Sequence, residues 1–174
     1  MDRILSGQFE VTIDDTGRIN LPRRLRFLEN DKVIITKGAD PCLWMYIAED
    51  WKDELKKIVE LTNPYSAQDR DIRRRFIGPA HETEVDKQGR ILISSHLREF
   101  AGLSKDCLIV GLYNYIEIWE PNKYKAYQVS EDEIIKRTED FSGRMKGSIE
   151  DVRNNAYSGF AGRDNPVFGA ERKE

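Results

Sequence analysis

Cysteine and histidine are scarce in this 174-residue chain, which contains two of each. Cys42 and Cys107 are too few for a disulfide framework and indicate reduced thiols in an intracellular protein. The N-terminus has no apolar stretch of a signal peptide, and no apolar run approaches the ~18 residues of a membrane span. The sequence therefore argues against secreted and membrane-spanning classes and predicts no membrane partner.

Motifs of catalysis and metal binding are also lacking. The chain has no Walker A loop, no Gly-x-Gly-x-x-Gly, no His-Glu-x-x-His and no Gly-x-Ser-x-Gly. His81, His96 and the two cysteines are not spaced as zinc ligands, and both cysteines fall in apolar, strand-like segments. We therefore predict that the protein is not an enzyme and needs no cofactor or metal.

Charge is nearly balanced, which argues against a surface coated with positive charge. The 28 Lys and Arg residues face 31 Asp and Glu residues, a net charge of −3. Two segments nevertheless contain basic and no acidic residues: 16–26, with Arg18, Arg23, Arg24 and Arg26, and 87–98, with Lys87, Arg90 and Arg98. Positive charge gathered on a small face is typical of a nucleic-acid binder.

An internal repeat organises the chain. Residues 11–26 recur 72 positions later as residues 83–98, and the parallel continues through two apolar, strand-like segments in each copy. The identical pairs are Asp14/Asp86, Gly17/Gly89, Arg18/Arg90, Ile19/Ile91, Leu25/Leu97 and Arg26/Arg98. The chain is a tandem duplication. A unit this small cannot bury a core alone, so we expect the copies to pack about a pseudo-twofold axis with their turns on one side.

Each copy predicts strand, turn, strand, short helix, strand, turn, strand. In the Asp-x-x-Gly-Arg turn, the aspartate bonds backbone amides and the glycine adopts a positive φ. Further helices are expected at 50–61, at 66–77 with Ser66 as N-cap, and after Pro121 and Ser130. The expected division is a first unit at 5–50, connecting helices at 51–78, a second unit at 79–121, C-terminal helices at 122–141 and a mobile tail at 142–174.

The arginine after each turn glycine is the sharpest candidate for binding. A guanidinium on a rigid turn can form bidentate hydrogen bonds with a guanine edge or a phosphate, and the aspartate four residues earlier can fix its direction. A hairpin turn with a solvated arginine is the alternative, and repetition of the motif weighs against it. Arg23 and Arg24 are weaker candidates, and at Arg26 and Arg98 we expect a structural ion pair.

Two other groups have structural interpretations. A second group of basic residues is interpreted as a solvated helix face or a subunit contact, with DNA backbone contact as the alternative. Its members are Arg70, Arg73, Arg74 and Arg75. We expect the three tryptophans to lie in the core or in a subunit interface. The candidates for that interface are Trp44, Trp51 or the 50–77 helices.

These motifs closely resemble the bacterial MraZ family over about residues 5–140. Besides the paired Asp-x-x-x-Arg motifs, the similar stretches are 17–22, 25–26, Gly78 with 80–82, 89–93, 97–98, 101–103, 110–111 and 117–119. The resemblance implies a β-rich α+β fold of two tandem swapped-hairpin AbrB-like (SpoVT-AbrB) units, packed as a pseudo-twofold double-psi-type or split β-barrel with flanking helices. It also implies a cytoplasmic, nucleoid-associated protein that forms a ring-shaped homo-oligomer.

The function implied by the resemblance is sequence-specific binding of short tandem promoter repeats in double-stranded DNA. The protein is expected to regulate, as a repressor, the division and cell-wall gene cluster. The candidate DNA-binding residues are Asp14, Thr16, Gly17, Arg18, Arg23, Arg24, Asp86, Lys87, Gly89 and Arg90. Thr16 stands where the family commonly has lysine, and Gln88 stands at the matching place, so a phosphate contact is expected to be missing. The alternative is an AbrB-like protein-interaction module of antitoxin type.

Overall fold

The computed structural model describes the backbone of residues 4–158 and the side chains of residues 4–146. The chain divides into two compact units, with the boundary between Tyr127 and Gln128. We describe each unit by itself and call the first unit the body.

The order of elements in both repeats is the one predicted. The first repeat and the connecting helices contain β1 (Leu5–Thr12), β2 (Arg18–Asn20), the 3-10 helix η1 (Arg23–Leu28), β3 (Lys32–Lys37), β4 (Leu43–Ile47), α1 (Ala48–Glu60) and α2 (Ala67–Phe76). The second repeat and its following helix contain β5 (His81–Glu84), β6 (Arg90–Leu92), α3 (Ser95–Ala101), β7 (Asp106–Tyr113), β8 (Tyr115–Trp119) and α4 (Pro121–Tyr127). The second unit contains α5 (Glu131–Ser158).

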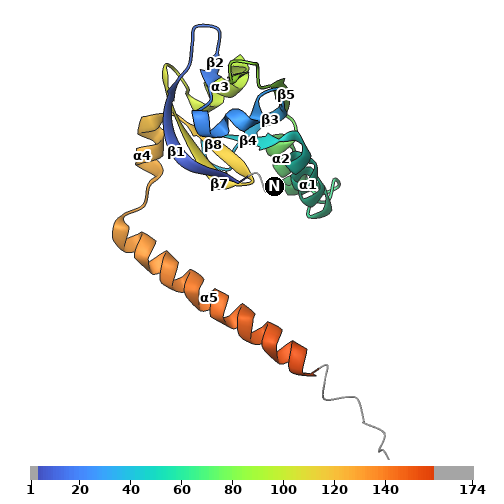
Figure 1. The fold of residues 1–174 in the computed structure, drawn as a ribbon. Helices are drawn as coiled ribbons and strands as arrows, with labels where there is room; N and C mark the ends of the chain where they lie inside the picture. The colour runs from blue at the N-terminus through green and yellow to red at the C-terminus, as the bar shows by residue number, and fades with distance from the viewer. Residues whose placement is uncertain (1–3, 159–174) are drawn as a thin grey trace, which may run out of the picture. The chain divides into compact units, whose positions relative to one another are not determined.

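The two repeats exchange strands. Six strands form one antiparallel sheet in the order β1-β7-β8-β4-β3-β5, and β2 pairs with β6 in a separate two-stranded ribbon (Figure 1). The first strand of each repeat pairs with the third strand of the other, β1 with β7 and β5 with β3. The fourth strands, β4 and β8, pair at the centre of the sheet. Interchanging the repeats reproduces the same strand order, so a pseudo-twofold axis passes between β4 and β8.

The fold is β-rich α+β, as predicted, but the expected closed barrel is wrong. Among the described residues, the six-stranded sheet is open, with β1 and β5 at its edges. The second strands explain the difference, because β2 and β6 have only three residues each and pair with each other. They form a ribbon of their own and do not join the two edges of the sheet.

Both repeats contribute equivalent residues to one core. Ile19 and Ile91 lie opposite each other in the ribbon, and both are completely buried. Leu25 of η1 and Leu97 of α3 belong to the same cluster, as do the inward-facing residues of the sheet. Since every layer of this core combines the two repeats, neither repeat has a core of its own.

Helices flank the sheet of the body. In Figure 1, α1 and α2 lie beside β3, and α4 lies on the opposite side near β1 and β7. The Ser66 cap of α2 is confirmed, since the Asp69 amide donates to Ser66 Oγ at 3.3 Å. Trp51 of α1 is buried against Ile34 and Tyr46, which confirms its interpretation as a core residue.

The C-terminal helix differs from expectation. α5 continues past Ser142, where we expected a mobile tail to begin. Gly143 and Gly147 lie inside the helix, where each costs about 1 kcal/mol relative to alanine without ending it. Ser130 caps the start, with the Glu133 amide donating to its Oγ at 3.3 Å. The last part of the predicted tail, 159–174, lies outside the described residues.

Candidate nucleic-acid interface

Both repeated arginines lie on one face of the β2–β6 ribbon. Arg18 is opposite Leu92 in the antiparallel register, and Asn20 is opposite Arg90. Side chains alternate between the faces of a strand, so these four residues share one face, and the other face carries the two buried isoleucines. The arginines are diagonal neighbours, which places their backbones roughly 7–8 Å apart. The ribbon therefore places both repeated arginines on the same face.

The first turn, residues 14–18, is closed by Asp14. Its Oδ1 accepts hydrogen bonds from the backbone amides of Thr16 and Arg18, both at 2.9 Å, and from the Thr16 hydroxyl at 2.6 Å. The same hydroxyl accepts a hydrogen bond from Arg18 Nη1 at 2.9 Å. Thr16 thus connects the arginine to the aspartate and restricts the direction of the guanidinium.

The second turn, residues 86–90, holds its arginine directly. Asp86 Oδ1 accepts hydrogen bonds from the backbone amides of Gln88 and Arg90, both at 2.9 Å. Arg90 Nε and Nη2 each lie 2.8 Å from Asp86 Oδ2, and Nη2 also donates to Gln88 Oε1. The Arg90 side chain remains 40% exposed, so it is oriented and still accessible.

The two turns are also tied to each other across the ribbon. The Leu21 amide donates to the Gly89 carbonyl at 2.8 Å, and the Ile93 amide donates to the Gly17 carbonyl at 2.9 Å. Gly17 and Gly89 have φ of +84° and +74°, the left-handed region that glycine adopts without strain. The glycines predicted as site residues therefore shape the turns and offer no side chain to a ligand.

Arg26 and Arg98 support the turns in place of the ion pairs that we expected. A Cβ at Gly17 would lie 2.9 Å from Arg98 Cζ, and a Cβ at Gly89 would lie 3.4 Å from Arg26 Nε. Each arginine thus packs against the turn of the opposite repeat, and a side chain at Gly17 would require Arg98 to shift. The ion-pair prediction is wrong, because no acidic side chain among the described residues pairs with either one, and Arg98 Nε is buried without a hydrogen-bond partner.

Hydrogen bonding stabilises the charged form of both turn carboxylates. The Thr16 hydroxyl, followed by the Arg18 amide, lowers the pKa of Asp14 below its ordinary value of 3.8. The Arg90 amide, followed by the Arg90 side chain, lowers the pKa of Asp86 in the same way. Both carboxylates are ionised at neutral pH and remain acceptors for the turn amides and for the arginines.

The other predicted contact residues are exposed near the turns. Arg23 and Arg24 begin η1 just after the ribbon strand β2, and Arg24 Nη2 lies 3.3 Å from Ser6 Oγ. Lys87 is exposed within the second turn. These three cations are exposed and close in sequence to the ribbon strands β2 and β6.

The sequence reading missed Asn20 and Leu92 as residues of this face. Asn20 is exposed and Leu92 is 37% exposed, although each neighbours a completely buried isoleucine. The signal was present in the alternation of Arg-Ile-Asn and Arg-Ile-Leu, where the first and third residues must share a face. Which face is exposed became clear only from the pairing of β2 with β6.

The arginine cluster of α2 binds protein groups within the body. Arg75 Nε donates to the Gly38 carbonyl at 3.0 Å, and its guanidinium lies 4.4 Å from the centre of the Phe100 ring. The other contacts are those of Arg70 with the carbonyls of Pro64 and Tyr65, of Arg73 with Thr62 and the Val59 carbonyl, and of Arg74 with Asp71. Only the Arg74 pair lies on an open helix surface, so a solvated face does not describe this cluster as a whole.

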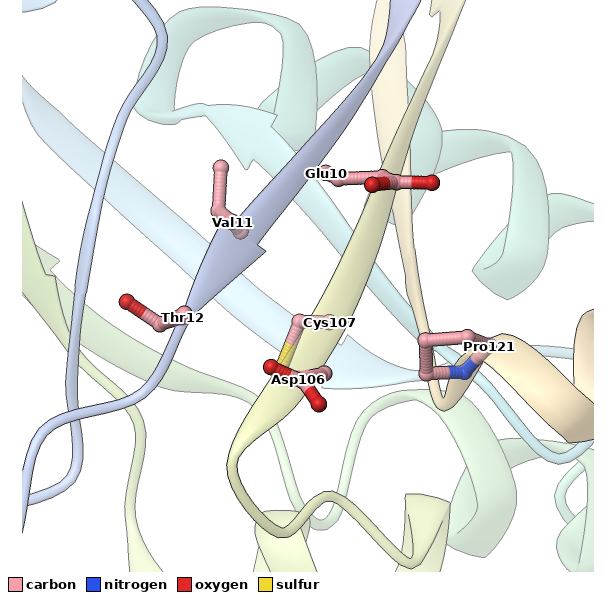
Figure 2. Close-up of a pocket in the computed structure, with 6 residues that line it drawn as sticks. All are labelled: Glu10, Val11, Thr12, Asp106, Cys107 and Pro121. Carbon is pink, nitrogen blue, oxygen red and sulfur yellow. The ribbon is translucent and has the colours of Figure 1, made fainter.

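A pocket between the ends of β1 and β7 and the start of α4 does not suit a nucleic acid (Figure 2). Two of its six lining residues are acidic and none is basic: Glu10, Val11, Thr12, Asp106, Cys107 and Pro121. Burial raises the pKa of Cys107 to about 11, so this thiol is protonated at neutral pH. Among the described residues, no cluster of three or more His, Cys, Asp or Glu side chains is arranged to hold a metal ion.

Fold and site together define a duplicated β-rich protein whose basic turns meet on one ribbon. The chain belongs to the MraZ family. The family model, described as "MraZ protein, putative antitoxin-like", matches residues 4–74 and 76–144, which correspond to the two repeats. This match confirms the resemblance seen in the sequence. The match ends at residue 144, inside α5.

Similar proteins carry the name "Transcriptional regulator MraZ". The Treponema denticola protein is 42% identical over 124 residues, which cover 71% of this chain and 86% of the relative. The protein of Caldanaerobacter subterraneus subsp. tengcongensis is 40% identical over 144 residues, which cover 80% of this chain and 99% of the relative. No helix in the described part of the chain is long and apolar enough to cross a membrane.

Proposed function

We propose that this protein is a sequence-specific DNA-binding transcriptional regulator that acts as a repressor. The observation that carries the proposal is the placement of Arg18 and Arg90 on one face of a two-stranded ribbon. The major groove of B-DNA admits such a ribbon, and arginine reads guanine there through a bidentate contact to O6 and N7. The naming of relatives as transcriptional regulators supports the same conclusion.

The ribbon face has the dimensions of a short base-pair sequence. A spacing of roughly 7–8 Å between diagonal neighbours equals about two base-pair steps of 3.4 Å. Arg18 and Arg90 contact guanines at that separation, and Asn20, which lies opposite Arg90, is suited to adenine. Leu92 offers an apolar contact to a thymine methyl group. Arg23, Arg24 and Lys87 bind the flanking phosphates and set the register of the ribbon.

The assembly is a ring of protomers, each with two tandem swapped-hairpin AbrB-like repeats, that grips tandem promoter boxes. The exchange of β1 and β5 between the repeats supports the swapped-hairpin description. The connecting helices supply the subunit contact, since Leu61 and Tyr65 between them are 83% and 91% exposed. Several weak box contacts made together give high affinity by multivalency. The protein acts in the cytoplasm on the nucleoid, at the division and cell-wall gene cluster.

The test is a gel shift with the DNA upstream of the protein's own gene and with a scrambled duplex of equal length. Arg18→Ala and Arg90→Ala should each weaken selective binding by roughly 5- to 150-fold, the loss of one bidentate base contact of about 1–3 kcal/mol. Arg74→Ala removes an equal charge from an exposed ion pair on α2 and should leave selective binding intact. If all three variants lose selective DNA binding to the same extent, the proposed site is wrong. It is also wrong if none of the three loses selective binding.

The second candidate, a protein-interaction module of antitoxin type, is favoured by the antitoxin-like description of the family. The two functions differ in their dependence on salt. Binding of DNA through arginines and lysines should fall steeply between 50 and 200 mM salt, because bound counterions are released from the phosphates. Affinity for a protein partner that changes little over this range, together with no selective retardation of DNA, would support the second function.

A further inference from the structure

The helix α5 carries an apolar face that is exposed in the structure. Ile134, Ile135, Phe141 and Met145 are each between 44% and 53% exposed. Gly143 and Gly147 weaken the isolated helix, since glycine is a poor helix former. A long helix with an apolar stripe and two internal glycines gains most of its stability from packing against a partner.

In a heptad frame, four of the six a and d positions along the helix are apolar. If Ile135 is placed at position a, the a and d positions in order are Ile135, Thr138, Ser142, Met145, Ile149 and Val152. Ile134 and Phe141 fall at g positions and widen the stripe on one side. A repeat of 3.5 residues is the pattern of helices that pair as coiled coils. Both glycines fall at b and f positions, on the side away from the stripe.

The e positions along the other edge of the stripe change sign halfway. They are occupied by Asp132 and Glu139 in the first half of the helix and by Lys146 and Arg153 in the second half. In an antiparallel pair, the e positions of one helix face the e positions of the other. Glu139 then meets Lys146 of the second copy, and Asp132 meets Arg153 of the second copy, so that all four contacts are between opposite charges.

In a parallel pair, the charged e residues do not face residues of opposite charge. There, each e residue faces a g position of the neighbouring helix, and the g positions Ile134 and Phe141 are apolar. In the antiparallel register the a and d positions pair as Ile135 with Val152, Thr138 with Ile149 and Ser142 with Met145, so each layer contains at least one apolar side chain. The same register therefore places an apolar side chain in every layer and opposite charges along the edge.

We infer that α5 is a self-association helix that pairs antiparallel with α5 of a second copy of this chain. The chains enter such a pair from opposite ends, roughly 40 Å apart at a rise of 1.5 Å per residue. Half of the pairing surface lies beyond residue 144, where the match to the family ends. The pair joins two bodies, or two rings of bodies, through a contact separate from the ribbon face.

Cysteine cross-linking of the full chain tests both the pairing and its direction. In the antiparallel register, position 138 lies against position 149 of the second copy, while two copies of position 138 lie too far apart for a disulfide. The variant with both Thr138→Cys and Ile149→Cys should form a covalent dimer on mild oxidation, and each single variant should remain monomeric on a non-reducing gel. Arg144→Cys, at an outward c position, controls for random collision. Cys42 and Cys107 are buried and stay in place.

Charge reversal provides a second measurement in the double-cysteine background. Glu139→Lys or Lys146→Glu alone places like charges together twice in each pair, and should raise the protein concentration needed for half-maximal cross-linking by about tenfold. Both reversals together restore opposite charges and should return the midpoint to its original value. Circular dichroism of each variant checks that helix content is retained.

Three outcomes would overturn the inference. The double-cysteine variant fails to cross-link, or Thr138→Cys alone cross-links as well as the double variant, which indicates a parallel pair. Alternatively, the combined charge reversal remains as weak as the single reversals, which shows that the e positions do not face each other.

Discussion

At the scale of single residues, the position before the turn glycine supplies a side chain that helps to hold each arginine. Thr16 and Gln88 occupy this position, and both accept a hydrogen bond from the arginine two residues later. The sequence analysis predicted only that a phosphate contact is missing where this residue is not basic. In the structure each side chain has a further role, because its hydrogen bond restricts the direction of the guanidinium.

Thr16→Val tests this role through the pKa of Asp14. Valine keeps the shape of threonine but lacks the hydroxyl, which is the largest cause of the low pKa of Asp14. We expect the pKa of Asp14 to rise towards its ordinary value of 3.8, as measured by NMR titration of the carboxyl carbon. Asp86 in the same sample is an internal control, since its pKa is lowered chiefly by Arg90.

The same shift defines an effect on stability. Because the folded-state pKa of Asp14 lies below its ordinary value, the ionised carboxylate stabilises the fold above that value, and this contribution is lost as the pH falls through the folded-state pKa. In Thr16→Val the contribution should be smaller, and its loss should be complete at a higher pH, because the folded-state pKa lies closer to the ordinary value. An unchanged Asp14 titration would show that the hydroxyl does not control the turn.

At the scale of elements, the β2–β6 ribbon separates a buried face from an accessible face within three residues of each strand. Ile91 is completely buried, while its neighbour Leu92 is 37% exposed. The Asp-x-x-Gly-Arg turns were predicted correctly, because their hydrogen bonds join residues at most four positions apart. The ribbon itself was not predicted, since it pairs strands from different repeats.

Ile91→Ala and Leu92→Ala provide a matched test of the two faces. Truncating the buried Ile91 should lower the free energy of unfolding by about 2–5 kcal/mol, since it leaves a cavity in the shared core. Truncating Leu92 should change it by no more than about 0.5 kcal/mol. Urea denaturation of both variants checks the contrast. Similar losses at the two positions would mean that the ribbon is covered on both faces.

At the scale of the whole molecule, the duplication produces one body instead of two domains. β1 pairs with β7, β5 pairs with β3, and the central pair is β4 with β8, so every repeat depends on the other for its sheet. The tandem repeat was evident in the sequence. The exchange of first strands and the open sheet were not, because periodicity reports which residues face inward and does not report which strands are neighbours.

Cutting the chain after Gly78 tests this dependence. Fragments 1–78 and 79–174 each lose the partners of their first strand and half of the shared core, so each alone should lack a cooperative unfolding transition. Mixed in equal amounts, they should associate and regain the circular dichroism of the intact chain. A cooperative transition from either fragment as a monomer would show that one repeat is sufficient to fold.

The sequence by itself determined the duplication, the two Asp-x-x-Gly-Arg turns and the membership of the MraZ family. These features depend on residue types at fixed short spacings, where a turn satisfies its own amides. Only the tertiary structure decided that Arg18 and Arg90 share a face, that Arg26 and Arg98 support the opposite turns, and that Arg75 binds Gly38. Those contacts join residues tens of positions apart, and packing of the common core selects them.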